Sequence, residues 1–147
     1  MAAPDKTAFR ALAVYVMIAM VMSQEADQKC LGCICEAVSG CDTSSKCEGD
    51  KCGPYRISPA YWADAGKPTV NGESPDGATA YTNCVSDKSC AGSAVKAYMA
   101  KYKKDCNGDG VIDCDDFILI HLFGGDACTE HKLPGAVESR YEKCMKG

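Results

Sequence analysis

Apolar residues recur along the chain at helical spacing, in short runs separated by polar segments rich in turn-forming residues. In the first of these runs, Leu31, Ile34 and Val38 fall at i, i+3 and i+7, which places them on one face of a helix that Gly40 ends. Comparable patterns later in the chain predict further short helices. The predicted helices span residues 30–39, 58–64, 91–104, 116–123 and 134–144.

The segments between these helices predict one small β element and one long loop. Residues 42–53 are rich in Ser, Gly, Asp and Cys and indicate a turn or a small hairpin, whereas residues 66–82 carry the Gly, Pro, Asn-Gly and Ser-Pro signals of a loop. Ser58 and Pro59 stand where a cap and a first helical residue are expected. Short helices with a small sheet predict an α+β fold in one domain.

An apolar run at the start of the chain predicts a signal peptide. Residues 11–22 read ALAVYVMIAMVM, follow Lys6 and Arg10, and are too few to span a bilayer. We expect cleavage after Ser23, which leaves residues 24–147 as the mature domain; the alternative is an N-terminal anchor. Because no second apolar run follows, we expect a secreted, extracellular protein that does not act at a membrane.

The cysteine content supports this compartment. All 12 cysteines lie beyond Ser23, a density typical of disulfide scaffolds in oxidising compartments, and the even number allows six bridges whose pairing the sequence does not give. The rival hypothesis is a zinc module, but Cys35 crowds the Cys30–Cys33 pair and no matching pair follows. The predicted disulfide cysteines are Cys30, Cys33, Cys35, Cys41, Cys47, Cys52, Cys84, Cys90, Cys106, Cys114, Cys128 and Cys144.

The charge of the chain excludes one class of partner. Without Lys6, Arg10 and Asp5, the mature chain carries 14 basic and 19 acidic residues. A nucleic-acid-binding protein would present a basic face, so we expect no nucleic-acid partner.

Several blocks of the mature chain resemble the invertebrate-type lysozymes, the destabilase-like family. The stretch CLGCICEAVSGC at 30–41 is similar to the opening helix of that family, and CGPYRISPAYWADAGKP at 52–68 is similar to its next block. Ala65 departs from the pattern, because many members have a cysteine there. The resemblance implies a disulfide-rich, lysozyme-like fold. Further matches are Cys84, Asp87 with Cys90, Tyr98 with Met99, and His121 followed by Gly-Gly and Cys128.

The resemblance also implies an enzymatic activity, but this chain differs from the family pattern at the catalytic residues. The family hydrolyses the β-1,4 bond between N-acetylmuramic acid and N-acetylglucosamine in peptidoglycan, with a Glu as general acid and an Asp as its partner. The position of that Glu is Val38 here, and the position of the Asp is Asp50, on a loop shorter than in active relatives. The basic residue linked to isopeptidase action in some members is Ser58 in this chain.

Valine at position 38 has no acidic proton to donate to the oxygen of the leaving sugar. A retaining glycosidase places two carboxyl groups about 5 Å apart, and one of them donates a proton. Glu36 lies two residues from Val38, about 200° around the helix, so it is expected to be a solvated residue pointing elsewhere. Glu48, two residues from Asp50, is the other candidate for a substitute acid. Asp50 itself is either a relic of the catalytic pair or an acid in a turn.

An aromatic-rich cluster predicts a sugar-binding surface that is kept even if the hydrolytic activity is lost. Tyr55, Ile57, Tyr61 and Trp62 supply flat apolar faces, and Arg56 supplies a polar rim, as in many ligand sites. The alternative is that Tyr61 and Trp62 are core residues.

The stretch DCNGDGVIDCDD at 105–116 matches the spacing of a calcium loop. Position 12 of the loop is an Asp, whose arm is shorter than that of the usual Glu, and the alternative is an acidic turn pinned by disulfides. No cofactor is required, and a Ca²⁺ ion here would be structural. The predicted ligands are Asp105, Asn107, Asp109, the Val111 carbonyl, Asp113 and Asp116.

Outside this loop, the lone His121 on an apolar helix is more often a core residue than a ligand.

These observations predict a secreted lysozyme homologue that binds peptidoglycan or amino-sugar polymers, with muramidase activity lost or very weak. We expect a monomer or weak dimer. One alternative is an active lysozyme in antibacterial defence or in the digestion of bacteria; another is an isopeptidase or a protein-binding role.

Overall fold

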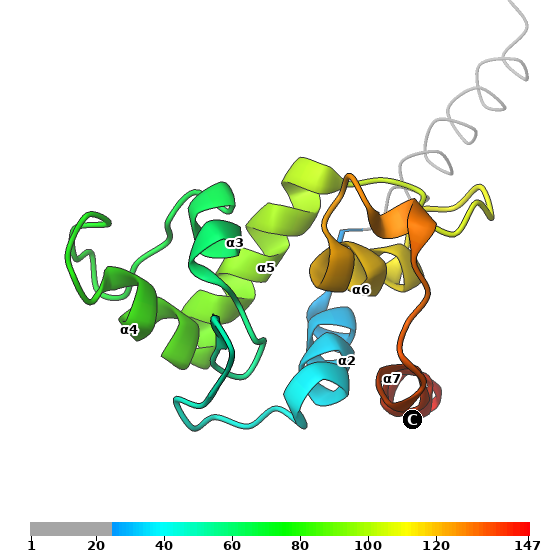
Figure 1. Cartoon of the computed structure of the whole chain (residues 1–147), viewed down its shortest axis with the longest axis horizontal. Helices are drawn as coiled ribbons and strands as arrows, with labels where there is room; N and C mark the ends of the chain where they lie inside the picture. Colours follow the sequence, from blue (N-terminus) through cyan, green and yellow to red (C-terminus); the bar gives the residue numbers. More distant parts are fainter. Residues whose placement is uncertain (1–24) are drawn as a thin grey trace, which may run out of the picture.

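Helices dominate the computed structural model, which describes residues 25–147 (Figure 1). The predicted signal peptide, residues 1–23, lies outside the described part. The α+β class is confirmed, because the one sheet of the described residues is a two-stranded antiparallel hairpin with Cys47 opposite Cys52. The elements are α2 (Gln28–Ser39), β1 (Cys47–Glu48), β2 (Lys51–Cys52), α3 (Pro59–Asp64), α4 (Ala80–Ser86), α5 (Lys88–Tyr102), α6 (Cys114–Phe123), the 3₁₀ turn η1 (Cys128–Glu130) and α7 (Gly135–Lys146).

Local capping chemistry ends α2 and begins α3 where the sequence predicts. Gly40 ends α2 in the left-handed region, with φ of 65°, and its N–H donates to carbonyls of the preceding turn. The Ser58 hydroxyl accepts a hydrogen bond from Tyr61 N at the start of α3, with Pro59 in the first turn. The predicted cap and stop residues are therefore confirmed at both helices.

Two helix assignments from the sequence were wrong in part. Helix α5 begins at Lys88 rather than at residue 91, because the Asp87 carboxylate accepts from Cys90 N at 2.7 Å and caps the helix earlier. Residues 80–82 belong to α4 and not to the predicted loop. The start of α4 has no side-chain cap, and the helix is held by burial of Ala80, Cys84 and Val85. Tertiary packing rather than a local signal forms this helix.

The core lies where α2, α5 and α6 meet. In Figure 1, α5 runs diagonally through the molecule, with α3 and α4 on one side and α2, α6 and α7 on the other. Ile34, Val95 and Ile120, one from each of the three central helices, are fully buried. No helix of residues 25–147 has the length and apolar character needed to cross a membrane.

Disulfides join the helices, as the cysteine count predicts. All 12 cysteines are paired, which excludes the zinc alternative at Cys30 and Cys33. Two bridges, whose cysteines are 84 and 111 residues apart in sequence, hold α2 to α6 and α7. The pairs are Cys30–Cys114, Cys33–Cys144, Cys35–Cys41, Cys47–Cys52, Cys84–Cys90 and Cys106–Cys128.

Candidate functional site

Val38 lies half-buried in the last turn of α2, at a point where the backbone is held from two directions. The carbonyl of the preceding residue, Ala37, accepts hydrogen bonds from Nε and Nη2 of Arg140 on α7, at 2.9 and 2.7 Å. The hydroxyl of the following residue, Ser39, donates to the Pro54 carbonyl. Any side chain at position 38 therefore starts from a fixed backbone.

Asp50 lies at the turn between β1 and β2, with its side chain exposed. The Tyr81 hydroxyl lies within hydrogen-bonding distance of the carbonyl oxygens of Asp50 and Ile57, which ties the hairpin to α4. Gly53 allows a close approach at the base of the hairpin, because a Cβ there would lie 1.8 Å from the Val85 carbonyl oxygen. The hairpin is thus fixed through its backbone, and the Asp50 carboxylate faces solvent.

Arg56 is committed to the hairpin and does not form an open polar rim. Its side chain is 10% exposed, and its Nη1 donates to the carbonyls of Lys46 and Gly53. Its guanidinium also forms ion pairs with Asp42 at 3.9 Å and with Glu48 at 3.5 Å. These contacts occupy the side chain that the sequence predicts to reach a ligand.

The carboxylates around Arg56 are poorly suited to act as general acids. Hydrogen bonds from Ser44, together with the nearby Lys46 and Arg56, lower the pKa of Asp42. Glu48 is 70% exposed and paired with the arginine, so it is not enclosed in an apolar pocket of the kind that surrounds a general acid.

Three of the residues predicted to contact sugar are buried. Tyr55 is 3% exposed, Ile57 is fully buried and Trp62 is 6% exposed. Trp62 Nε1 donates to the Pro68 carbonyl at 2.9 Å. The structure corrects the prediction of an exposed aromatic platform, because closely packed core residues present no free face to a ligand. Trp62 is the core residue of the alternative hypothesis.

The half-buried Tyr61 and the buried His121 form a hydrogen-bonded pair. The Tyr61 ring stacks on Tyr98 at 3.8 Å between centroids, and its hydroxyl lies 2.9 Å from His121 Nδ1. His121 Nε2 lies 2.8 Å from the Tyr55 carbonyl oxygen, which can only accept. Nε2 must therefore carry the proton, and Nδ1 accepts from the Tyr61 hydroxyl. His121 is a satisfied core residue, as the sequence predicts.

Acid is expected to destabilise the protein through His121. Burial lowers the pKa of His121 to about 4, against the opposing effect of its bond to Tyr55. The unfolded chain binds the proton below about pH 6.5, and the folded chain does not bind it until about pH 4. The stabilisation is complete above pH 6.5 and is lost as the pH falls, by about 3 kcal/mol at pH 4. Urea unfolding at pH 7 and pH 4 measures this loss.

Substitution of His121 by glutamine separates this residue from the other titrating groups. Glutamine keeps one donor and one acceptor but does not titrate, so the difference in unfolding free energy between wild type and His121→Gln should shrink from pH 7 to pH 4. A difference that stays constant with pH would contradict the assignment.

The acidic loop brings three of its predicted ligands together. Carboxylate oxygens of Asp105, Asp109 and Asp116 lie within 4.8 Å of one another. Asp116 is fully buried, and its oxygens accept from the backbone N–H groups of Cys106, Asn107 and Asp113. Like charges at such distances repel one another, and a bound cation relieves this repulsion.

The other predicted ligands have separate roles or face solvent. Asp113 caps α6, where its carboxylate accepts from Asp115 N, and burial raises the pKa of Asp113. The amide of Asn107 contacts the Asp109 carboxylate, and Val111 is 41% exposed. The hydrogen bonds hold the loop in shape, so the geometry fits both a calcium loop and a disulfide-pinned acidic turn. The calcium site stays a prediction.

If the loop binds calcium, addition of 5 mM Ca²⁺ after chelation should raise the Tm by several degrees, because an ion that binds only the folded state stabilises it. Asp109→Asn should lose most of this increase. The matched control is Asp126→Asn, which removes an exposed charge outside the loop. Equal increases in both variants would contradict a specific site.

A groove that the sequence does not predict lies among the C-terminal elements of the structure. It has a volume of about 720 Å³ and lies between α7 and the α6–η1 segment. Neither Val38 nor Asp50 lines it. The groove forms only when α7, near the end of the chain, packs back on α2, so no local pattern could have revealed it.

Comparisons with known proteins agree with the fold. The family model described as Destabilase matches residues 27–144. The chain is 36% identical over 108 residues to Invertebrate-type lysozyme 3 of Caenorhabditis elegans, which covers 70% of this chain and 76% of that protein. It is 32% identical over 117 residues to Lysozyme 1 of Crassostrea virginica, which covers 74% of this chain but only 54% of that longer protein.

A solved structure is similar over most of the chain. The crystal structure of Aeromonas hydrophila PliI in complex with Meretrix lusoria lysozyme contains a chain that matches with a TM-score of 0.59 and 28% identity. The match covers 82% of this chain and 88% of that chain.

Proposed function

Because the chain belongs to the destabilase family of invertebrate-type lysozymes, we propose that it is a secreted member that binds peptidoglycan or a related amino-sugar polymer, with muramidase activity lost or very weak. The observation that carries this proposal is the valine at position 38, where the resemblance to the family implies the general acid. Valine has no proton to give to the leaving oxygen, and general acid catalysis contributes about 10²–10⁴-fold to such reactions.

The environments of Glu36 and Glu48, the two candidates for a substitute general acid, support the loss of muramidase activity. Glu36 is exposed on α2, about 200° around the helix from Val38, so it points away from any cleft lined by position 38. Glu48 is held by Arg56 at the hairpin. An active lysozyme would require one of them to reach the glycosidic oxygen to within a fraction of an ångström.

A polar pocket beside the hairpin supports retained binding of a polymer. It has a volume of about 590 Å³, and it offers the hydroxyl, amide and carboxylate groups that hydrogen-bond sugars. Asn83 Nδ2 lies 3.2 Å from the Glu73 carboxylate, so the amide and the carboxylate are already oriented by each other. The residues that line the pocket are Ser45, Val70, Asn71, Glu73, Thr82, Asn83, Ser86 and Asp87.

An isopeptidase role has less support. Ser58 replaces the basic residue linked to that activity in some relatives, and its hydroxyl is used as the cap of α3. All cysteines of the chain are in disulfides, so none is a free thiolate nucleophile.

Sedimentation with insoluble peptidoglycan tests the binding part of the proposal. Oxidised mature protein should pellet with the polymer, and Asn83→Ala should pellet less, because it removes a hydrogen-bonding group from the polar pocket. Glu36→Gln is the matched control on the surface outside this pocket and should pellet like the wild type. Protein that stays in the supernatant at every polymer concentration would contradict the proposal.

A further inference from the structure

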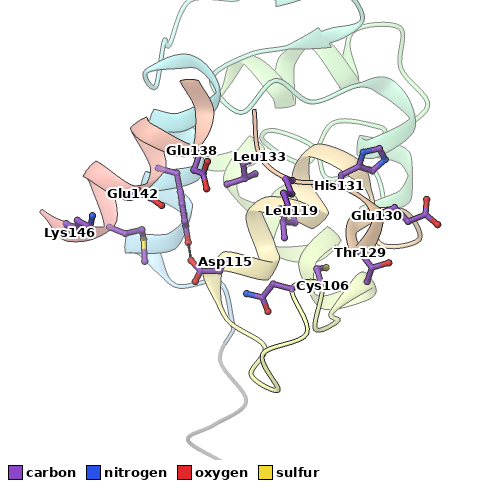
Figure 2. Close-up of a pocket in the computed structure, with 14 residues that line it drawn as sticks. Cys106, Asp115, Leu119, Thr129, Glu130, His131, Leu133, Glu138, Glu142 and Lys146 are labelled. Carbon is purple, nitrogen blue, oxygen red and sulfur yellow. Dashed lines mark hydrogen bonds between the residues drawn. The ribbon is translucent and has the colours of Figure 1, made fainter. Parts of the chain in front are cut away.

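The groove between α7 and the α6–η1 segment has one wall made by a single face of a helix (Figure 2). Glu138, Tyr141, Glu142 and Met145 follow one another at helical spacing, i, i+3, i+4 and i+7, and therefore lie on the same side of α7. The opposite wall is the segment from Thr129 to Leu133, as the labelled side chains in Figure 2 show.

Apart from Tyr141, this face of α7 stays open because the helix is attached to the protein through residues on its other sides. Cys144 forms the disulfide with Cys33 of α2, and Arg140 donates to the Ala37 carbonyl. Between α7 and α6, the Tyr141 hydroxyl donates to Asp115 Oδ1 at 2.6 Å, which fixes the width of the groove at this point. The groove is thus part of a cross-linked framework.

The groove combines an apolar lining with uncompensated negative charge. Leu119, Leu133 and Met145 contribute buried or half-buried apolar surface. The exposed carboxylates of Glu138 and Glu142 stand on the α7 wall, and within the described residues neither has an ion-pair or hydrogen-bonding partner in its side chain. The apolar lining and the negative wall together favour an occupant with apolar and cationic groups.

The basic residues of the groove do not neutralise this wall. Lys146 lies at one end of the groove on α7, and Lys132 lies on the opposite segment. Neither forms an ion pair with a described carboxylate. His131 stacks on Phe123 at 4.4 Å between ring centroids. The part of the groove beside Glu138 and Glu142 therefore remains acidic.

From this arrangement we infer that the groove binds an extended peptide segment in which lysine or arginine residues alternate with apolar ones. Alternate side chains of an extended chain point to opposite sides, so apolar groups can contact the floor at Leu119 while cationic groups reach Glu138 and Glu142. The volume of about 720 Å³ lies within the range of sites for small ligands and short peptides. This inference stands apart from polymer binding and from the chemistry at position 38.

The test uses a hexapeptide of alternating leucine and lysine, acetylated and amidated at its ends, titrated into the oxidised mature protein at low salt. NMR chemical-shift changes should concentrate at the groove residues, with a Kd below 1 mM. The double variant Glu138→Gln/Glu142→Gln should weaken binding by about tenfold, the sum expected for two exposed ion pairs. Added salt should weaken the wild type more than this variant.

The matched control is Glu25→Gln/Glu36→Gln, which makes the same change of net charge at exposed positions outside the groove. It should bind the peptide like the wild type. An equal loss in both double variants would mean attraction to the acidic protein as a whole and would overturn the inference, as would shift changes away from the groove or no binding at 1 mM peptide.

Discussion

Val38→Glu is expected to release reducing ends from insoluble peptidoglycan about 10²–10⁴-fold faster than the wild type, which is the usual contribution of a general acid. The backbone that carries the new side chain is already fixed. Arg140 donates hydrogen bonds to the carbonyl of the residue before position 38. The hydroxyl of Ser39, the residue after it, donates to the Pro54 carbonyl. The hairpin that carries Asp50 is tied to α4 through Tyr81. Position 38 is half-buried, and partial burial of a carboxyl favours its protonated form.

Val38→Gln is the control for this gain. Glutamine has nearly the same size as glutamate but cannot donate an acidic proton. The Val38→Gln variant should therefore release no more reducing ends than the wild type. A gain in both variants would show that polarity and not proton donation was missing. Silence of Val38→Glu would mean that the shortened hairpin does not bring Asp50 into reach.

Loss of the bridge between α2 and α6 should produce a large change in stability. Cys30→Ala/Cys114→Ala is expected to lower the free energy of unfolding by about 3–5 kcal/mol, since the bridge closes a loop with a sequence separation of 84. Both cysteines are buried, so their removal also leaves space in the core. Urea unfolding without reductant measures the difference.

The hairpin bridge is the matched control. Cys47–Cys52 has a sequence separation of 5, and Cys47 is exposed. Its removal by Cys47→Ala/Cys52→Ala should cost only about 2 kcal/mol, because closing a short loop removes less entropy from the unfolded chain. If the two double variants were equally stable, loop closure would not be what the α2–α6 bridge contributes.

Features set by neighbouring residues were predictable from the sequence. The stop at Gly40, the cap at Ser58 and the hairpin within residues 42–53 depend on turn and cap chemistry that acts over a few positions. The burial of His121 was also predictable, because the residue lies within an apolar helical run, but its hydrogen-bonding partners Tyr61 and Tyr55 are distant in sequence and were not. Disulfide formation followed from the number of cysteines and the expected compartment.

Features set by distant residues were not predictable in this way. Helix α4 has weak local signals and forms through burial against the rest of the domain. The aromatic cluster was expected at a surface, but Tyr55 and Trp62 are enclosed by elements far away in sequence. The same holds for the disulfide pairing and for the groove beside α7, which depends on the Cys33–Cys144 bridge with a sequence separation of 111. Aromatic content does not distinguish a binding face from a core.

The protein is proposed to bind the polymer without cutting it, and one assay measures both binding and cutting. Oxidised mature wild type is mixed with insoluble peptidoglycan, and the pelleted protein and the released reducing ends are measured in the same tube. We predict protein in the pellet and a release of reducing ends no greater than without protein. Sustained release that grows with protein concentration would contradict the proposal. Glu36 and Glu48 would then be the residues to substitute next in the search for the proton donor.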